Sequence, residues 1–229
     1  MPVYNEEKIV QESMRRVSAF MALKNYRWEL IISSDGSTDK TDSLVHSFIE
    51  AHPQNPIHLL TAEKNKGKGA AARRGVGTAI GRHILITDAD LSAPIKEVDK
   101  LIHALEEGYD IAIGSRRSEP GCDVQQSFKR RLAGRVYNIF VQTLALRGFL
   151  DTQCGFKCFK CEAAKTIFRK QKLDGFSFDV EILYLAKKEG FKIKEVPVMW
   201  RQGQDSHVRL VRDAVHMVKD LFVLRKIHG

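Results

Sequence analysis

The sequence has no apolar stretch of the ~18 residues that a helix needs to cross a bilayer. Its longest apolar candidate, Val136–Leu146, is interrupted by three polar residues. The opening residues Met1–Glu7 have neither the basic nor the apolar part of a secretory signal, and no repeat or low-complexity linker is present. We therefore expect no membrane-spanning helix, no secretion signal and no repetitive architecture.

Cysteine is scarce, with only four residues, Cys122, Cys154, Cys158 and Cys161. Without an export signal, a disulfide framework is not expected. The spacing Cys154-x3-Cys158-x2-Cys161 comes close to a zinc pattern but lacks a fourth ligand. A strand over Phe156–Phe159 would put Cys154 and Cys158 on one face and Cys161 on the other. Reduced thiols are the favoured interpretation.

Acidic residues are outnumbered, 28 against 37 Lys and Arg, which gives a net charge of +9. Such a balance indicates an anionic partner, either nucleic acid, a lipid headgroup or a phosphorylated small molecule. The basic residues concentrate in two segments, 63–82 and 115–149. Basic and aromatic residues do not interleave, so a nucleic-acid partner is not expected.

The remaining composition, 43% hydrophobic and 28% charged over 229 residues, is typical of one globular domain. Short aliphatic segments alternate with helical patterns, which predicts a three-layer α/β fold of Rossmann type with a mostly parallel sheet. Predicted strands are Glu29–Ser33, Ile57–Thr61, His83–Thr87, Asp110–Gly114, Phe156–Phe159 and Lys192–Pro197. Predicted helices are Lys8–Leu23, Lys40–Ala51, Gly69–Ile80, Ile95–Glu107, Ser127–Arg147, Glu162–Arg169, Phe178–Glu189 and Val208–Lys226.

We expect residues 1–229 to form a single domain with two halves, 1–114 and 115–229. Residues 1–5 read as the end of a first strand whose earlier part is missing, so the sheet is expected to open with a truncated strand.

Polar residues follow each predicted strand of the first half, at Tyr4–Glu7, Ser34–Asp39, Lys64–Gly69 and Asp88–Asp90. In open α/β sheets, ligands bind beyond the carboxyl ends of the strands. Four such loops at one edge predict a ligand site.

Asp88-Ala89-Asp90 is the sharpest chemical signal in this set. Alternation in an extended segment puts both carboxylates on one side, and hard oxygen ligands of this kind suit Mg²⁺ or Mn²⁺ on a diphosphate. The alternative is a helix cap ahead of Pro94, which would account for one carboxylate and not two.

The other motifs each leave an alternative open. Asn65–Gly69 could hold phosphate at a helix N-terminus, or its lysines could be solvated surface. Ser34–Asp39 could be a turn followed by a helix cap. Arg116, Arg130 and Arg131 offer guanidinium groups for a second phosphate or a solvated helix face.

Two further candidates lie in the second half. Asp179 and Glu181 form an acidic pair that could equally complement a helix dipole. His207, in a polar loop, is a candidate phosphate contact.

Taken in order, these motifs resemble the inverting GT-A-fold glycosyltransferases, most closely the dolichyl- and polyprenyl-phosphate β-glucosyltransferases. The resemblance rests on Pro2–Glu7, Asp35–Asp39, Asn65–Gly69 and Asp88–Ser92 in the first half, and on Gly114–Arg116, Asp151–Lys157, Phe178–Glu181 and Glu195–Trp200 in the second. It implies a nucleotide-sugar half and an acceptor half.

The resemblance also implies roles for individual residues. Pro2, Tyr4, Glu6, Asp35, Lys68 and Ala89 would border the nucleotide; Asp88 and Asp90 would hold Mg²⁺ or Mn²⁺; Arg116 with Arg130 or Arg131 would grip the acceptor phosphate. The family's usual Asp-Asp-Gly-Ser reads Ser34-Asp35-Gly36-Ser37 here, a departure that bears on base recognition.

The implied activity is inverting transfer of a hexose, foremost glucose from UDP-glucose, to a polyprenyl phosphate. GDP-mannose as donor is the near alternative, and a non-catalytic relic that binds nucleotide or lipid phosphate is another. The implied location is cytoplasmic and peripheral, on the cytosolic face of a membrane. A homo-oligomer is compatible with the sequence.

Overall fold

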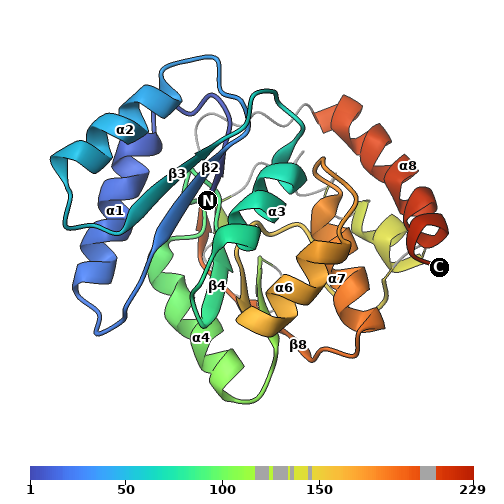
Figure 1. Cartoon of the computed structure of the whole chain (residues 1–229). Coiled ribbons are helices and arrows are strands. Elements are labelled where there is room, and N and C mark those ends of the chain that lie inside the picture. The colour runs from blue at the N-terminus through green and yellow to red at the C-terminus, as the bar shows by residue number, and fades with distance from the viewer. Residues whose placement is uncertain (117–123, 126–133, 135–136, 144–145, 202–209) are drawn as a thin grey trace.

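Two hydrogen-bonded sheets lie between layers of helices (Figure 1). The structure, a computed structural model, describes residues 1–116, 124–125, 134, 137–143, 146–201 and 210–229. The first sheet is parallel, in the order β1 (Pro2–Val3), β2 (Leu30–Ser34), β3 (Ile57–Thr61). The second has the order β4 (His83–Ile86), β7 (Lys157–Lys160), β5 (Ile111–Ser115), β8 (Ile193–Pro197). A short parallel pair joins β6 (Val124–Gln125) to β9 (Trp200–Arg201).

The strand β7 is the exception to the parallel pattern, because it runs antiparallel to both β4 and β5, while β5 and β8 are parallel. The three-layer α/β fold with parallel pairing is thus confirmed. The first strand has two residues, whose backbone pairs with Ser33 and Ser34 of β2.

The helices form close to where the apolar spacing predicts them. They are α1 (Val10–Ala22), α2 (Thr41–Ala51), α3 (Lys68–Thr78), α4 (Val98–Glu106), α6 (Cys161–Lys170), α7 (Phe178–Lys188) and α8 (Leu210–His228). The helix predicted over Ile95–Glu107 begins with a separate 3-10 turn, Ile95–Glu97, ahead of α4. Of the helix predicted over Ser127–Arg147, the structure describes helical residues at 134 and 137–143. Among the described residues, no helix is long and apolar enough to cross a membrane.

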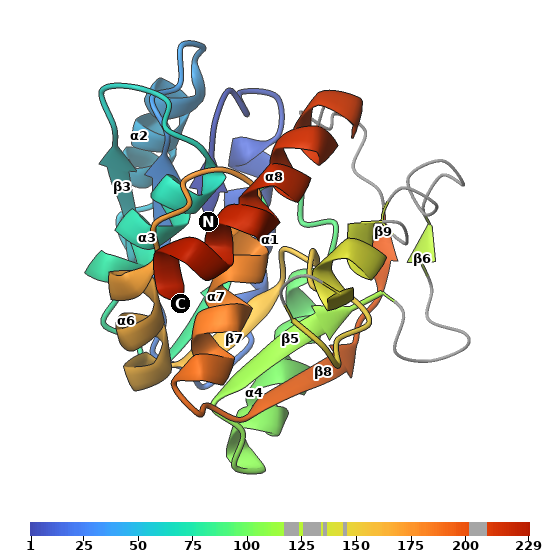
Figure 2. The ribbon, with the colours of Figure 1, turned by 90° about the vertical axis from the view of Figure 1, so that its right-hand side faces the viewer.

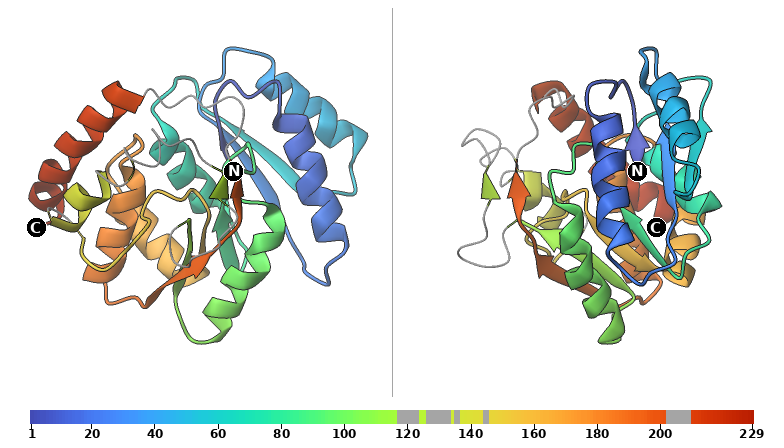
Figure 3. Two further views of the ribbon diagram at one scale, coloured as in Figure 1. Left: turned by 180° about the vertical axis from the view of Figure 1, so that it is seen from behind. Right: turned by 90° about the vertical axis from the view of Figure 1, so that its left-hand side faces the viewer.

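Side-chain alternation along the strands builds a core on each face. Ile111, Ile113 and Phe159 face α3, α6 and α7, whereas Ala112 and Cys158 face α4. Viewed from behind, α1 and α4 cover the face opposite α3 and α6 (Figure 3). α8 lies beside α7, where Leu221 is fully buried (Figure 2).

The cysteines follow this alternation. Cys154 and Cys158 are buried in the α4-side cluster, and Cys161 packs against the other cluster. The predicted division of the three thiols between two faces is confirmed.

A buried ion pair ties β7 to the first turn of α7. The Lys157 ammonium lies 2.5 Å from Asp179 Oδ1, and the two side chains are 1% and 5% exposed. Lys157 Nζ also donates to the Cys154 carbonyl at 2.5 Å. Asp179 therefore has a fixed structural partner.

Glu181, the second member of the predicted acidic pair, also has internal partners. Its oxygens accept the backbone N–H groups of Lys172 and Leu173 at 2.7 and 2.8 Å, and Oε1 lies 2.6 Å from His228 Nε2. The pair thus anchors β7, the 171–175 segment and α8, and the helix-dipole interpretation covers only part of its role.

Removal of the Lys157 ammonium should destabilise the fold strongly, because it leaves the Asp179 carboxylate buried without a counter-charge. We expect Lys157→Met to lower the free energy of unfolding by about 3–5 kcal/mol. Lys160→Met, on the same strand, removes a partly exposed pair with Asp110 and should cost about 1 kcal/mol or less. Urea denaturation measures both, and equal losses would contradict the assignment.

Candidate active site

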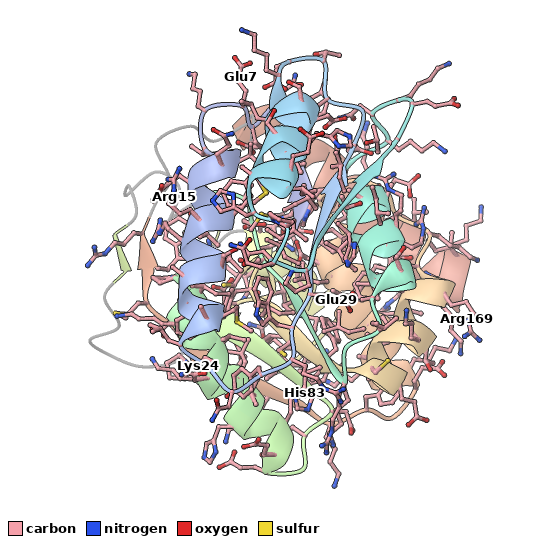
Figure 4. The ribbon with its side chains drawn as sticks, turned by 60° about the vertical axis from the view of Figure 1, so that its left-hand side comes forward. Glu7, Arg15, Lys24, Glu29, His83 and Arg169 are labelled. Atoms are coloured by element: carbon pink, nitrogen blue, oxygen red, sulfur yellow. The ribbon has the colours of Figure 1, made fainter. Side chains whose placement is uncertain are left out.

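The polar loops that follow the parallel strands gather at one end of the molecule. Glu7, which follows β1, lies at that end, whereas His83, the first residue of β4, lies toward the opposite end (Figure 4). Asp35 and Asp88 follow the carboxyl ends of β2 and β4. This is the edge at which open α/β sheets bind ligands.

The loop after β1 is hydrogen-bonded to the loop after β2. The N–H groups of Asn5 and Glu6 donate to the hydroxyls of Ser37 and Thr41 at 3.1 and 2.7 Å. The Glu7 N–H donates to Asp39 Oδ2 at 3.1 Å, and the Thr41 N–H donates to Asp39 Oδ1. Burial tends to raise the pKa of Asp39, but these hydrogen bonds outweigh it and hold the pKa below its usual value. The N-cap position of α2 is Lys40, which makes no side-chain cap bond, so Asp39 acts instead as a bridge between the two loops.

Asp35 lies beneath these loops and is 2% exposed. Its Oδ2 accepts the backbone N–H groups of Lys66 and Gly67 at 3.0 and 2.6 Å. Among the described residues, Oδ1 is buried and has no hydrogen-bond partner. Buried polar atoms are nearly always paired, so this oxygen is an exception and has an acceptor position to spare.

Ser34, which replaces the family's usual aspartate, is fully buried. Its hydroxyl lies 3.0 Å from the Ser37 hydroxyl. The difference from the family's usual sequence therefore lies in the protein interior, at the residue that precedes Asp35.

Several backbone N–H groups at the N-terminus of α3 are bonded from within the chain. The N–H groups of Gly69 and Ala70 donate to the Asp174 carbonyl at 2.7 and 3.2 Å, and the Gly67 N–H is taken by Asp35. A Cβ on Gly67, which has φ +119°, would overlap the Asp174 carbonyl oxygen. The glycines of Asn65–Gly69 thus allow the 171–175 segment to approach, and the N–H groups of Gly67, Gly69 and Ala70 are already hydrogen-bonded within the chain.

Lys68, the first residue of α3, points its ammonium at Asp88 Oδ1, 2.6 Å away. Burial alone would lower the pKa of Lys68, but Asp88, Asp179 and Asp90 together raise it well above the ordinary value. The lysine is therefore charged at every working pH. A fixed cation thus stands beside the first carboxylate of the predicted metal motif.

The Asp88–Asp90 segment forms a tight turn. The Leu91 N–H donates to the Asp88 carbonyl at 3.2 Å, and Leu91 adopts φ +46°. Asp90 accepts the Ser92 N–H at 2.9 Å and the Ser92 hydroxyl at 2.7 Å. Ala89 is buried, and its carbonyl accepts the Ser13 hydroxyl.

Arg116, at the end of β5, is held by a fork of hydrogen bonds to Asp151. Nε and Nη2 donate to the two carboxylate oxygens at 2.7 and 2.8 Å. Burial tends to lower the pKa of Arg116, and the charge of Asp151 raises it above its ordinary value. Glu195 on β8 accepts the N–H groups of Leu150 and Asp151, both at 2.8 Å, and so fixes the segment that carries the carboxylate.

The structure thus brings together Asp35, Lys68, Asp88 and Asp90 and orients Arg116 from the second half. Pro2 is buried, and Tyr4 and Glu6 lie in the loop beside Asp35. Arg130, Arg131 and His207 lie outside the described residues. Asp151, Glu195 and Lys157 belong to motifs of the resemblance but had no role assigned from the sequence, because their partners lie elsewhere in the chain.

The donor set at this edge fits a divalent cation. Asp88 and Asp90 supply hard carboxylate oxygens, and the Asp88 side chain is 34% exposed. Among the described residues, no three or more His, Cys, Asp or Glu side chains gather into a metal site. Mg²⁺ is commonly held by one or two carboxylates with substrate phosphates completing the shell, so two carboxylates suffice only together with a diphosphate.

An α/β domain with an Asp-x-Asp turn and a lysine at the carboxyl edge of its sheet is the arrangement of a GT-A glycosyltransferase. The model of "Glycosyl transferase family 2" matches residues 1–168. The chain belongs to this family, which confirms the resemblance seen in the motifs.

Curated relatives match over nearly the whole chain. The dolichyl-phosphate beta-glucosyltransferase of Dictyostelium discoideum is 36% identical over 236 residues, 98% of this chain and 72% of that protein. The proteins of the same name from Homo sapiens and Saccharomyces cerevisiae are 32% and 31% identical, with 98% of this chain and 73% and 72% of theirs covered.

Solved structures share the fold at lower identity. Glucosyl-3-phosphoglycerate synthase from Mycobacterium tuberculosis, in complex with Mn²⁺, UDP and phosphoglyceric acid, superimposes with a TM-score of 0.70 at 17% identity. The match covers 98% of this chain and 75% of that one. A complex of that enzyme with Mg²⁺ and UDP gives a TM-score of 0.69 at 18% identity.

Cys154 and Cys158 should be unreactive in the folded protein. Burial raises the pKa of each thiol to about 12, so at pH 8 the nucleophilic thiolate is a fraction on the order of 10⁻⁴. We expect iodoacetamide at pH 8 to leave both unmodified in native protein and to modify both in urea, as read by peptide mass spectrometry. Equal modification in the two states would contradict their burial.

Proposed function

We propose that this protein transfers glucose from UDP-glucose to dolichyl phosphate or a related polyprenyl phosphate, with inversion at the anomeric carbon. Two features at the same end of the molecule carry the proposal. One is the buried Asp35 oxygen, which has no partner among the described residues, and the other is the Lys68–Asp88–Asp90 cluster. The names of the curated relatives support glucose and a dolichyl phosphate acceptor. Residues 1–114 would bind the donor and 115–229 the acceptor within one domain.

On the donor side, Asp35 Oδ1 would accept an N–H of the nucleobase, and Pro2, Tyr4 and Glu6 would border the nucleotide. Ala89 would border the same site through its backbone. The Lys68 ammonium, fixed by Asp88, would lie against the diphosphate. The family resemblance implies these roles, and the position of the residues near the carboxyl ends of β1, β2 and β4 supports them.

Asp88 and Asp90 would hold Mg²⁺ or Mn²⁺, which would supply charge stabilisation to the departing diphosphate. The Lys68 ammonium contributes positive charge at the same place. Electrostatic stabilisation of a leaving group is strongest when the charges are already in position, and the Lys68–Asp88 pair meets that condition.

The acceptor phosphate is ionised at neutral pH, so its oxygen needs no general base. That oxygen would attack the anomeric carbon as the bond to the diphosphate oxygen breaks, with the electron pair leaving on UDP. Arg116, with Arg130 or Arg131, would orient the acceptor phosphate. Asp151 already fixes the plane of the Arg116 guanidinium, which is the kind of positioning on which such a displacement depends.

A basic cavity beside α7 and α8 supports peripheral docking on the membrane that holds the acceptor. It measures about 580 Å³, and its described lining contains four cations and no carboxylate: Gln142, Thr143, Leu146, Arg147, Tyr184, Lys187, Lys188 and Arg225. Ile139 and Phe140 on one side and Phe222 and Val223 on the other are 41–63% exposed.

Ile139, Phe140 and Phe222 each lie one turn from a residue of the cavity, as Phe222 does from Arg225. Apolar side chains around cations match an anionic bilayer surface, such as the cytosolic leaflet.

Asp90→Ala should abolish donor binding that depends on metal. We expect isothermal titration of UDP-glucose with Mn²⁺ to show binding by the wild type and at least tenfold weaker binding by Asp90→Ala. Neither the wild type nor Asp90→Ala should bind GDP-mannose. Asp99→Ala removes an aspartate of α4 that is paired with Lys24, and this variant should bind like the wild type. Binding of neither donor by folded wild type would favour a non-catalytic relic, and preference for GDP-mannose would reassign the sugar.

Phe222→Ser combined with Arg225→Glu should weaken attachment to anionic membranes. We expect the wild type to sediment with vesicles of 30% phosphatidylserine and not with pure phosphatidylcholine, and the double variant to lose most of this binding while UDP-glucose binding persists. Leu23→Ser, which removes a side chain 85% exposed next to Lys24, is the matched control. Equal sedimentation of wild type and double variant would rule out this surface.

A further inference from the structure

The backbone at Gly155 touches the carboxylate of Asp88. A Cβ built on Gly155 would overlap Asp88 Oδ2 and would lie 2.5 Å from Oδ1 and 2.6 Å from Cγ. Real Cβ atoms essentially never come within 3.0 Å of a heavy atom from another part of the structure. Any residue other than glycine therefore requires a shift of Asp88 or of the Gly155 backbone.

The Gly155 backbone has little freedom to move away. Its neighbours Cys154 and Phe156 are each 1% exposed and pack in the α4-side cluster. The Phe156 carbonyl accepts the Gly114 N–H at 2.7 Å, and Lys157 is in register with Ile86 of β4. The antiparallel ladder between β4 and β7 thus fixes where residue 155 meets the end of β4.

The Asp88 carboxylate is held from the other side as well. Lys68 Nζ lies 2.6 Å from Oδ1, and the flanking residues Thr87 and Ala89 are each 4% exposed. A carboxylate displaced by a Cβ at position 155 would have to leave the ammonium or push α3 outward. α3 itself is pinned, because the Gly69 N–H and the Arg73 side chain both bind Asp174.

We propose that Gly155 is a positioning residue that sets the orientation of the Asp88 carboxylate for the donor diphosphate and its metal ion. This inference rests on the proposed function, since it assigns Asp88 to the donor. Because Gly155 has no side chain, it leaves room for the Asp88 carboxylate. The carboxylate thus lies between the Lys68 ammonium and the Gly155 backbone, which together set its orientation. The acceptor-half segment Asp151–Lys157 thereby takes part in shaping the donor half.

Binding measurements test the functional side. We expect Gly155→Ala to weaken Mn²⁺-dependent UDP-glucose binding at least tenfold, while binding of UDP without metal changes less than threefold. Gly77→Ala, in α3 where a Cβ would meet nothing within 4 Å, is the matched control and should bind like the wild type. Wild-type affinity in Gly155→Ala would overturn the inference and leave the proposed function intact. A wild type that does not bind UDP-glucose would overturn the proposed function and, with it, the role of Gly155.

A stability cycle tests the contact without any ligand. We expect Gly155→Ala to lower the melting temperature by roughly 3–10 °C in the wild type and by much less in Asp88→Ala, because the shorter side chain removes the clash. If Gly155→Ala alone does not fold, the double variant should still fold. Equal losses in both backgrounds, or a double variant that is also unfolded, would overturn the inference.

Discussion

The contact on which the rest of the edge depends is made by one carboxylate, which has close neighbours on two sides. Asp88 lies between the Lys68 ammonium and the Gly155 backbone. The three residues come from β4, α3 and the entry to β7, so their meeting depends on how those elements pack. A partly buried lysine is stabilised by a partner, and a carboxylate at a proposed donor site needs a defined orientation; the same contact meets both demands.

The loop that opens α3 shows how the fold limits its ligand chemistry. The N–H groups of Lys66 and Gly67 go to Asp35, and those of Gly69 and Ala70 go to the Asp174 carbonyl. The positive charge that this segment turns toward Asp88 is the Lys68 side chain. The glycines that suggested a phosphate loop instead permit two backbone segments to approach closely.

The second half contributes buried charges in pairs. Asp151 bridges Arg116 to the segment fixed by Glu195, and Lys157 bridges β7 to α7 through Asp179. Isolated buried charges are costly, and such pairs are stable only where geometry supplies all partners. These pairs hold the edge rigid, which suits a reaction in which the protein mainly positions two phosphate-bearing substrates.

The sequence by itself determined the fold class, the approximate helices and strands and the edge at which Asp35, Lys68, Asp88 and Asp90 gather. Apolar periodicity and strand-end loops are local patterns, so one chain read in order is enough to find them. The tertiary structure alone decided the antiparallel course of β7, the internal capping of α3 and the partners of Asp151, Asp179 and Glu195. Each of these depends on residues 22 to 105 positions apart in the chain, and the space beside Gly155 is a property of packing that no local pattern records.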